Sequence, residues 1–94
     1  MNLPPEIAPE QSLIVYPCCF PIKVMGANAE GFLPAMVHVA RAFDPGFDET
    51  TVEQRPSKAG NYLGLTLSVN VTSREQLDEL YRTLTTHPMV KIVL

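Results

Sequence analysis

Residues 62–71 read Tyr-Leu-Gly-Leu-Thr-Leu-Ser-Val-Asn-Val and form the clearest structural pattern in the chain. Every second residue is aliphatic, from Leu63 to Val71, and the residues between them are small, polar or aromatic. Strict alternation is typical of a strand with one buried face, because successive strand side chains point to opposite faces. Ten residues at about 3.3 Å each span about 33 Å, so this strand can cross a whole sheet.

Weaker patterns on both sides of this strand predict three further strands and two helices. Alternating apolar residues predict strands, and apolar residues at helical spacing predict helices. In chain order, the predicted elements are a strand at 20–25, a helix at 29–43, a strand at 50–55, the strand at 62–71, a helix between Thr72 and His87, and a strand at 89–94. The connection at residues 57–61 has the length of a hairpin.

Local signals mark where the two helices begin and end. Asn28 is a candidate cap for the first helix, although Pro34 moves its regular part nearer to Phe32, because proline is tolerated only in the first turn. The second helix is expected to start with a capping box of Thr72 and Glu75, or with the same box shifted by one residue. Asp-Pro-Gly at 44–46 ends the first helix, and His-Pro at 87–88 ends the second.

The element order predicts an α+β fold, a ferredoxin-like βαββαβ two-layer sandwich. Right-handed crossovers give an antiparallel sheet with spatial order 4-1-3-2 and both helices on one face. The aliphatic side chains of residues 62–71 are expected to meet the helices. We expect one domain at residues 14–94, preceded by a proline-rich tail at 1–13 that is disordered or loosely docked.

Composition and charge exclude several classes of protein. The chain has 94 residues, of which 46% are apolar and 18% charged, with a net charge of −3. This balance indicates a globular protein without a general basic field for nucleic acid or an anionic membrane. An apolar run long enough to cross a bilayer is absent from the sequence, as is a secretory signal, so a cytoplasmic location is expected.

The open face of the predicted sheet carries the first candidate binding residues. Lys23 and Lys91 are expected to be neighbours there, because the first and last strands pair, and Arg55 and Tyr62 are expected to share that face. Met25 and Val93 are expected there as well, with Val90, Ile92 and Leu94 on the opposite face of the last strand. An RNA-recognition module stacks bases on aromatic rings of such a sheet face and carries basic side chains around them. With only one ring among these residues, single-stranded RNA binding is the alternative hypothesis for this face.

Residues that commonly carry catalysis or bind metals form no recognised constellation in the sequence. Cys18 and Cys19 are adjacent, so a strand would point them to opposite faces, one half-buried and one exposed, which suits no shared metal. His38 is expected to be a partly buried structural residue, and His87 to lie at a helix end. We therefore expect no catalytic residues, metal or cofactor; for an undetected enzyme, Asn28, Lys58 or Cys18 are the conceivable participants.

The turn at Gly26, Ala27 and Asn28 offers backbone groups at a position where related sandwiches hold small ligands. These three residues are therefore candidates for binding a small molecule. The mixed open face is a candidate surface for a protein partner or a second copy. A non-enzymatic regulatory or interaction module is the function that these features favour.

Several segments resemble the YbeD-like family of small uncharacterised bacterial proteins. They are Phe-Pro-Ile-Lys-Val-Met-Gly at 20–26, Pro-Ser-Lys-Ala-Gly-Asn-Tyr at 56–62, Leu-Tyr at 80–81 and Val-Lys-Ile-Val-Leu at 90–94. The resemblance implies a ferredoxin-like fold similar to the ACT regulatory domain, which binds amino acids at interfaces in metabolic enzymes. It implies no established activity and no catalytic residues. Sensing of a small ligand such as an amino acid is a further expectation.

Overall fold

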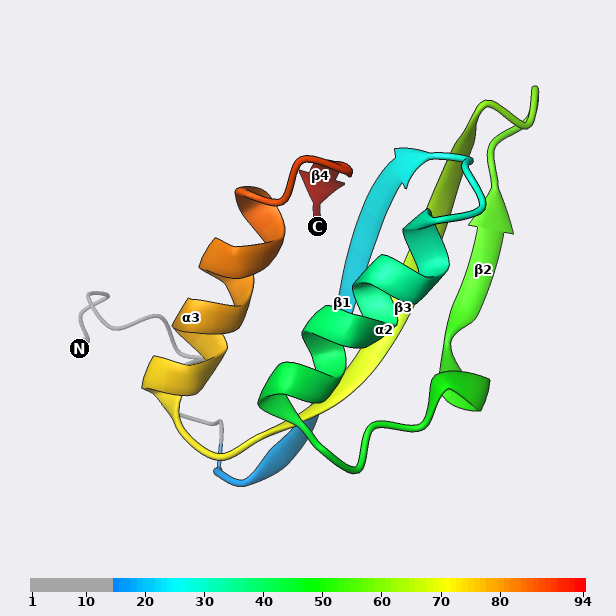
Figure 1. Cartoon of the computed structure of the whole chain (residues 1–94). Coiled ribbons are helices and arrows are strands. Elements are labelled where there is room, and N and C mark those ends of the chain that lie inside the picture. Colours follow the sequence, from blue (N-terminus) through cyan, green and yellow to red (C-terminus); the bar gives the residue numbers. More distant parts are fainter. Residues whose placement is uncertain (1–14) are drawn as a thin grey trace, which may run out of the picture.

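A computed structural model describes residues 15–94, so the tail predicted at 1–13 lies outside the described residues. Four strands and two helices follow each other in the predicted order (Figure 1). The elements are β1 (Cys18–Ala27), α2 (Phe32–Phe43), the 3-10 turn η1 (Glu49–Thr51), β2 (Glu53–Pro56), β3 (Tyr62–Val71), α3 (Arg74–Thr85) and β4 (Val90–Val93).

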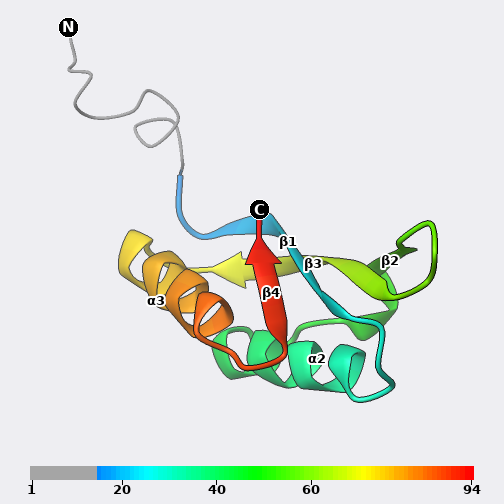
Figure 2. The ribbon, with the colours of Figure 1, turned by 90° about the horizontal axis from the view of Figure 1, so that it is seen from above.

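The strands form one antiparallel sheet in the order β2-β3-β1-β4. This is the predicted order 4-1-3-2 read from the other edge, and the α+β ferredoxin-like fold is confirmed. The long strands β1 and β3 pair along all ten residues, from Cys18 opposite Val71 to Ala27 opposite Tyr62. Figure 2 shows both helices on one side of the sheet, so the other side is a separate surface, named here the open sheet face.

The core lies between the helices and the sheet. The aliphatic residues of β3 face the helices as predicted, because antiparallel pairing puts them on the same side as Ile22 and Val24 of β1. Apolar residues of both helices close the layer from the other side. The buried core residues are Ile22, Val24, Phe32, Met36, Val37, Val39, Ala40, Phe47, Leu63, Leu65, Leu67, Val69, Val71, Leu77, Leu80 and Leu84.

The first helix begins at Phe32, as Pro34 requires, but its predicted cap is wrong. Gly31 is the N-cap residue and gives no side-chain hydrogen bond. The Asn28 side chain instead donates from Nδ2 to the carbonyl of Gly60 at 3.0 Å. The Asn28 amide donates to the carbonyl of Asn61 at 2.9 Å. Asn28 therefore joins the end of β1 to the β2–β3 hairpin, because its donors find better acceptors there.

The second helix is capped by Ser73, so the predicted capping box of Thr72 and Glu75 is wrong. The alternative box shifted by one residue, Ser73 with Gln76, is close to the structure. Ser73 Oγ accepts from the amide of Gln76 at 3.1 Å, and Gln76 Oε1 accepts from the amide of Thr72 at 2.7 Å. Gln76 Nε2 also donates to the carbonyl of Phe43 at 3.2 Å. A glutamine can accept and donate at once, which explains why Gln76 replaces Glu75 in this role.

The strand predicted at 50–55 is shorter and starts later in the structure, at Glu53. Before it, η1 forms because Asp48 Oδ1 accepts from the amide of Thr50 at 2.9 Å and from its hydroxyl at 2.7 Å. Aspartate side chains that bond to nearby backbone amides compete with strand ladders in this way. Val52, the aliphatic residue within the predicted strand at 50–55, lies between η1 and β2 in the chain and packs against the core.

The last strand departs from the predicted alternation, because Val90 lies on the core side whereas Ile92 and Leu94 lie on the open sheet face. Val24 pairs with Val93 and Met25 with Ile92, but Gly26 pairs with Val90, so a bulge separates the two parts of the register. As a result, Val90 and Val93 both pack against the core. An extra residue in one strand shifts the alternation by one, which sequence periodicity alone does not show.

Candidate functional site

Two rows of side chains cross the open sheet face from β4 to β2. Residues that pair across antiparallel strands point to the same face, so the register defines each row. The first row, in the order β4, β1, β3, β2, is Ile92, Met25, Gly64 and Arg55. The second row is Leu94, Lys23, Thr66 and Glu53; Leu94 lies just beyond β4, and its amide donates to the carbonyl of Lys23 at 2.8 Å.

The β4 side of these rows is apolar and exposed. Ile92 is 45% exposed and Leu94 73% exposed, and Met25 beside Ile92 is half-buried. Tyr62, opposite Ala27 in the next row, is 43% exposed. Among the described residues, only one other large apolar side chain, Val15, is comparably exposed. Grouped exposed apolar side chains are a common mark of an interaction surface.

The β2 side of the rows carries both signs of charge around a hollow. Gly64 lacks a side chain, and a hollow of about 300 Å³ lies over this part of the face. Its lining includes Lys23, Arg55, Glu53, Thr66 and Leu94. None of the ion pairs between described residues involves Lys23, Arg55 or Glu53. These charges are therefore available to groups outside the chain.

The structure brings three of the predicted open-face residues together and separates the fourth. Lys23 and Arg55 line the same hollow, and Tyr62 lies on the same face. Lys91 is exposed but does not lie beside Lys23, because the register puts Leu94 opposite Lys23 and Ile92 opposite Met25. The predicted pairing of Lys23 with Lys91 is therefore wrong. Val93, also expected on this face, packs against the core instead.

Sequence reasoning did not place Ile92, Leu94 and Glu53 on the open sheet face. Periodicity counted from residue 89 put Ile92 and Leu94 on the buried face, whereas the bulge beside Gly26 puts them on the open one. The break before β4 at His87-Pro88 gave no sign of where pairing resumes. Glu53 follows from the register of β2, because Glu53 pairs with Thr66 and Arg55 with Gly64.

In the turn proposed as a ligand site, one of the three residues is buried and closely packed against other elements. Gly26 is buried, and a Cβ atom built on it would lie 2.3 Å from the carbonyl oxygen of Met89 and 2.8 Å from the ring of Phe32. Ala27 and Asn28 are exposed. Only these two of the three residues present atoms to a ligand, and the Asn28 amide groups are already bonded to the hairpin.

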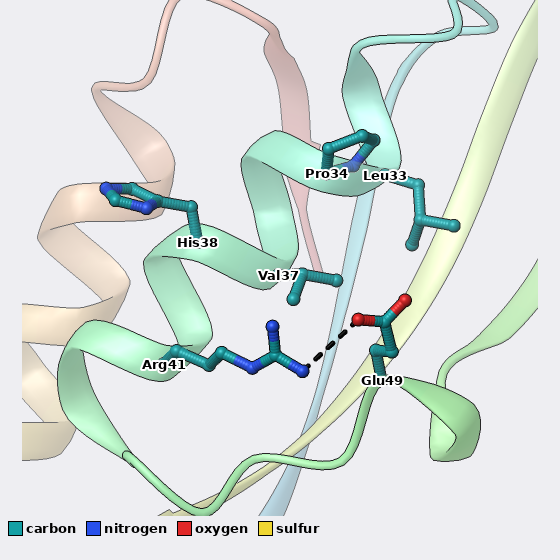
Figure 3. A pocket seen from close by; sticks show the side chains of 6 residues that line it. All are labelled: Leu33, Pro34, Val37, His38, Arg41 and Glu49. Carbon is teal, nitrogen blue, oxygen red and sulfur yellow. Dashed lines mark hydrogen bonds and ion pairs between the residues drawn. The ribbon is translucent and has the colours of Figure 1, made fainter.

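A second hollow, of about 350 Å³, lies along α2 and faces η1 (Figure 3). Its lining residues are Leu33, Pro34, Val37, His38, Arg41 and Glu49. Arg41 Nη2 and Glu49 Oε1 form an ion pair at 3.2 Å across one end. Figure 3 shows the His38 ring pointing away from that pair. The charges here satisfy each other, and the geometry provides no base beside a nucleophile.

The remaining titratable and thiol groups have structural explanations. His38 is exposed, so its predicted partial burial is wrong, whereas His87 Nδ1 accepts from the amide of Met89 at 3.1 Å. Hydrogen bonds from Thr50 lower the pKa of Asp48, and burial raises the pKa of Tyr81.

The cysteines lie as predicted, with Cys18 half-buried and Cys19 exposed. Within residues 15–94, histidine, cysteine and carboxylate side chains form no group of three that could hold a metal ion.

None of the helices in the described part of the chain is both long and apolar enough to cross a membrane.

Residues 11–94 match the family described as "Protein of unknown function (DUF493)". The chain is 67% identical over 89 residues to a UPF0250 protein of Leptothrix cholodnii, covering 95% of this chain and 98% of that protein.

Other relatives give the same result. A UPF0250 protein of Bordetella pertussis is 62% identical over 89 residues, covering 95% of this chain and 98% of the relative. One from Ralstonia nicotianae is 56% identical over 93 residues, covering 99% of this chain and 96% of the relative. None of these names states an activity. The chain belongs to the DUF493, or UPF0250, family of small bacterial proteins of unknown function, in agreement with its YbeD-like resemblance.

Proposed function

We propose that this protein is a non-enzymatic interaction module that binds another protein surface through its open sheet face. One observation carries the proposal: exposed Ile92 and Leu94 lie in the same two rows as the charges of Lys23, Arg55 and Glu53, on the side of the sheet opposite the helices. An apolar centre beside charges that have no ion-pair partner among residues 15–94 is typical of a protein interface.

The helical side of the molecule lacks these properties. On α3, Arg74 pairs with Asp78 and Arg82 with Glu79, so four of its five charged side chains are paired and only Glu75 is not. Surface ion pairs of this kind are solvated, and each contributes little free energy. The contrast between the two sides supports the open sheet face as the interaction surface.

Site-specific photo-cross-linking in the native bacterium tests this proposal. A benzophenone amino acid at position 92 lies on the open sheet face, and the same probe at Glu75 of α3 is the matched exposed control. We expect cross-linked protein from position 92 and much less from position 75. Equal yields at the two positions, or no product at position 92, would contradict the proposal.

We further propose that the hollow over Gly64 receives a small ligand. Lys23 and Arg55 supply positive charge for a carboxylate, Glu53 negative charge for an ammonium group, and Leu94 an apolar wall, which together suit an amino acid. Binding there should raise the melting temperature of the protein at millimolar amino acid. An unchanged melting temperature across a set of amino acids would remove this part of the proposal.

Binding of single-stranded RNA receives less support from the same face. Lys91 lies away from Lys23, Tyr62 is the one aromatic ring in the rows described, and Glu53 adds a negative charge beside Arg55. RNA recognition on a sheet favours several rings within a basic surface. We therefore expect flat fluorescence anisotropy when labelled single-stranded RNA is titrated with this protein at low salt.

A further inference from the structure

We propose that the open sheet face pairs with the same face of a second copy of this chain. The inference rests on the proposed function and names the partner surface. The two-fold axis lies in the interface, midway between the two rows and perpendicular to the strands. Face-to-face sheets in proteins pack about 10 Å apart with strands aligned to within about 30°, and a two-fold axis perpendicular to the strands keeps the strands of the two copies aligned in this way.

The rotation exchanges the two rows, and each strand of one chain then faces the same strand of the other chain. The first row of one chain then faces the second row of the other. Ile92 meets Leu94, Met25 meets Lys23, Gly64 meets Thr66, and Arg55 meets Glu53. Each contact occurs twice, because an isologous interface uses the same patch on both subunits.

All four pairs are chemically complementary. Ile92 and Leu94 bury exposed aliphatic surface against each other, and the aliphatic stem of Lys23 can lie along Met25. Gly64 leaves the space that Thr66 of the second copy fills. Arg55 and Glu53 are opposite charges, and neither forms an ion pair with another residue in the described part of the chain.

The rows on either side of these two rows are also complementary in size. Tyr62 and Ala27 lie one row beyond the first, and Ser68 and Pro21 lie one row beyond the second. The same axis puts the exposed ring of Tyr62 over the small Ser68 of the second copy. A large side chain over a small one is what close packing between two faces requires.

The charges on the open sheet face favour binding of a second copy of this chain over binding of other partners. An acidic peptide would satisfy Lys23 and Arg55 but would be repelled by Glu53, and a nucleic acid would meet the same obstacle. A second copy presents both signs in the reversed order, so Arg55 and Glu53 are satisfied together. The patch is therefore complementary to itself in a way that a partner of one sign is not.

Sedimentation equilibrium of the full chain, from micromolar to millimolar protein, tests the inference. We expect reversible dimers that weaken in Arg55→Glu and in Glu53→Arg, because each single change makes like charges face each other. The double variant with both changes restores opposite charges and should associate nearly as the wild type does. Lys58→Glu, in the exposed hairpin outside both rows, is the matched control for a change of charge.

The expected sizes separate the outcomes. Each single reversal should raise the dimer dissociation constant by about tenfold or more, since like charges at an interface are strongly unfavourable. The double variant and Lys58→Glu should stay within about threefold of wild type, the change expected where charge complementarity is kept. Circular dichroism checks that each variant is folded, as the exposure of residues 53, 55 and 58 predicts.

Two results would overturn pairing with a second copy. One is a wild-type chain that stays monomeric up to millimolar protein, which is also the result expected if another segment of the same chain covers the face. The other is a dimer that both single reversals leave unchanged. A monomer whose position 92 cross-links to a different protein in cells would reject this inference and leave the proposed function standing.

Discussion

A side chain at residue 26 would collide with two other elements at once. A Cβ atom on Gly26 would lie 2.3 Å from the carbonyl oxygen of Met89 and 2.8 Å from the ring of Phe32. Met89 precedes β4, and the bulge in the pairing of β1 with β4 begins at Gly26. The absence of a side chain here therefore allows the bulge that puts Ile92 and Leu94 on the open sheet face.

We expect Gly26→Ala to lower the free energy of unfolding by about 1–3 kcal/mol, the usual cost of overpacking a core. The contact with Met89 involves a backbone atom, which puts the expected value in the upper part of that range. Urea denaturation measures it. Gly46→Ala is the control, because its nearest atom would be Asp44 Oδ1 at 3.7 Å and a change within about 0.5 kcal/mol is expected. Equal denaturation midpoints for the two variants would contradict this account of Gly26.

At the scale of elements, Asp44 connects the end of α2 to the far end of β3. Its carboxylate is buried; Oδ2 accepts from the amide of Asn70 at 3.0 Å and from the Asn70 side chain at 3.1 Å, and Oδ1 accepts from the amide of Gly46 at 3.2 Å. β2 pairs with β3 only as far as Thr66. Asp44 thus satisfies a strand amide that lies beyond the end of this pairing.

We expect Asp44→Ala to lower the free energy of unfolding by about 1–3 kcal/mol, because three donors lose a charged acceptor. Asp44→Asn keeps one acceptor oxygen and should fall between the alanine variant and wild type. Asp78→Ala, which removes an exposed ion pair with Arg74, should change the free energy by less than about 1 kcal/mol. Urea denaturation of the three variants compares them; a similar loss in Asp44→Ala and Asp78→Ala would refute the role given to Asp44.

Regular elements could be predicted from the sequence wherever local pattern and tertiary packing agree. The alternation at 62–71 and the apolar spacing of α3 correspond to β3 and α3 within a few residues. β2 and β4 were less predictable because a local side-chain turn sets the start of β2 and non-local pairing sets the faces of β4. The turn at Asp48 shortens the first of these strands, and the bulge beside Gly26 shifts the second.

At the scale of the whole molecule, the candidate site is a product of strand register. Lys23, Arg55 and Tyr62 could be placed on the open sheet face from alternation within single strands. The two rows need four strands in register, and a one-residue shift in β4 exchanges its exposed and buried residues. The self-complementary order of Ile92, Met25, Gly64 and Arg55 against Leu94, Lys23, Thr66 and Glu53 is therefore visible only in three dimensions.

The claim that carries most of this interpretation is that two copies of the chain associate through their open sheet faces, and a dilution series of amide nitrogen–proton NMR spectra tests this claim. Pairing of the two faces should change the chemical shifts of residues in the two rows, of Tyr62 and of Ser68 as the protein concentration rises. The chemical shifts of exposed residues on α3 should stay unchanged. Spectra that do not change between micromolar and millimolar protein, or shifts that cluster on α2 and α3, would contradict the claim.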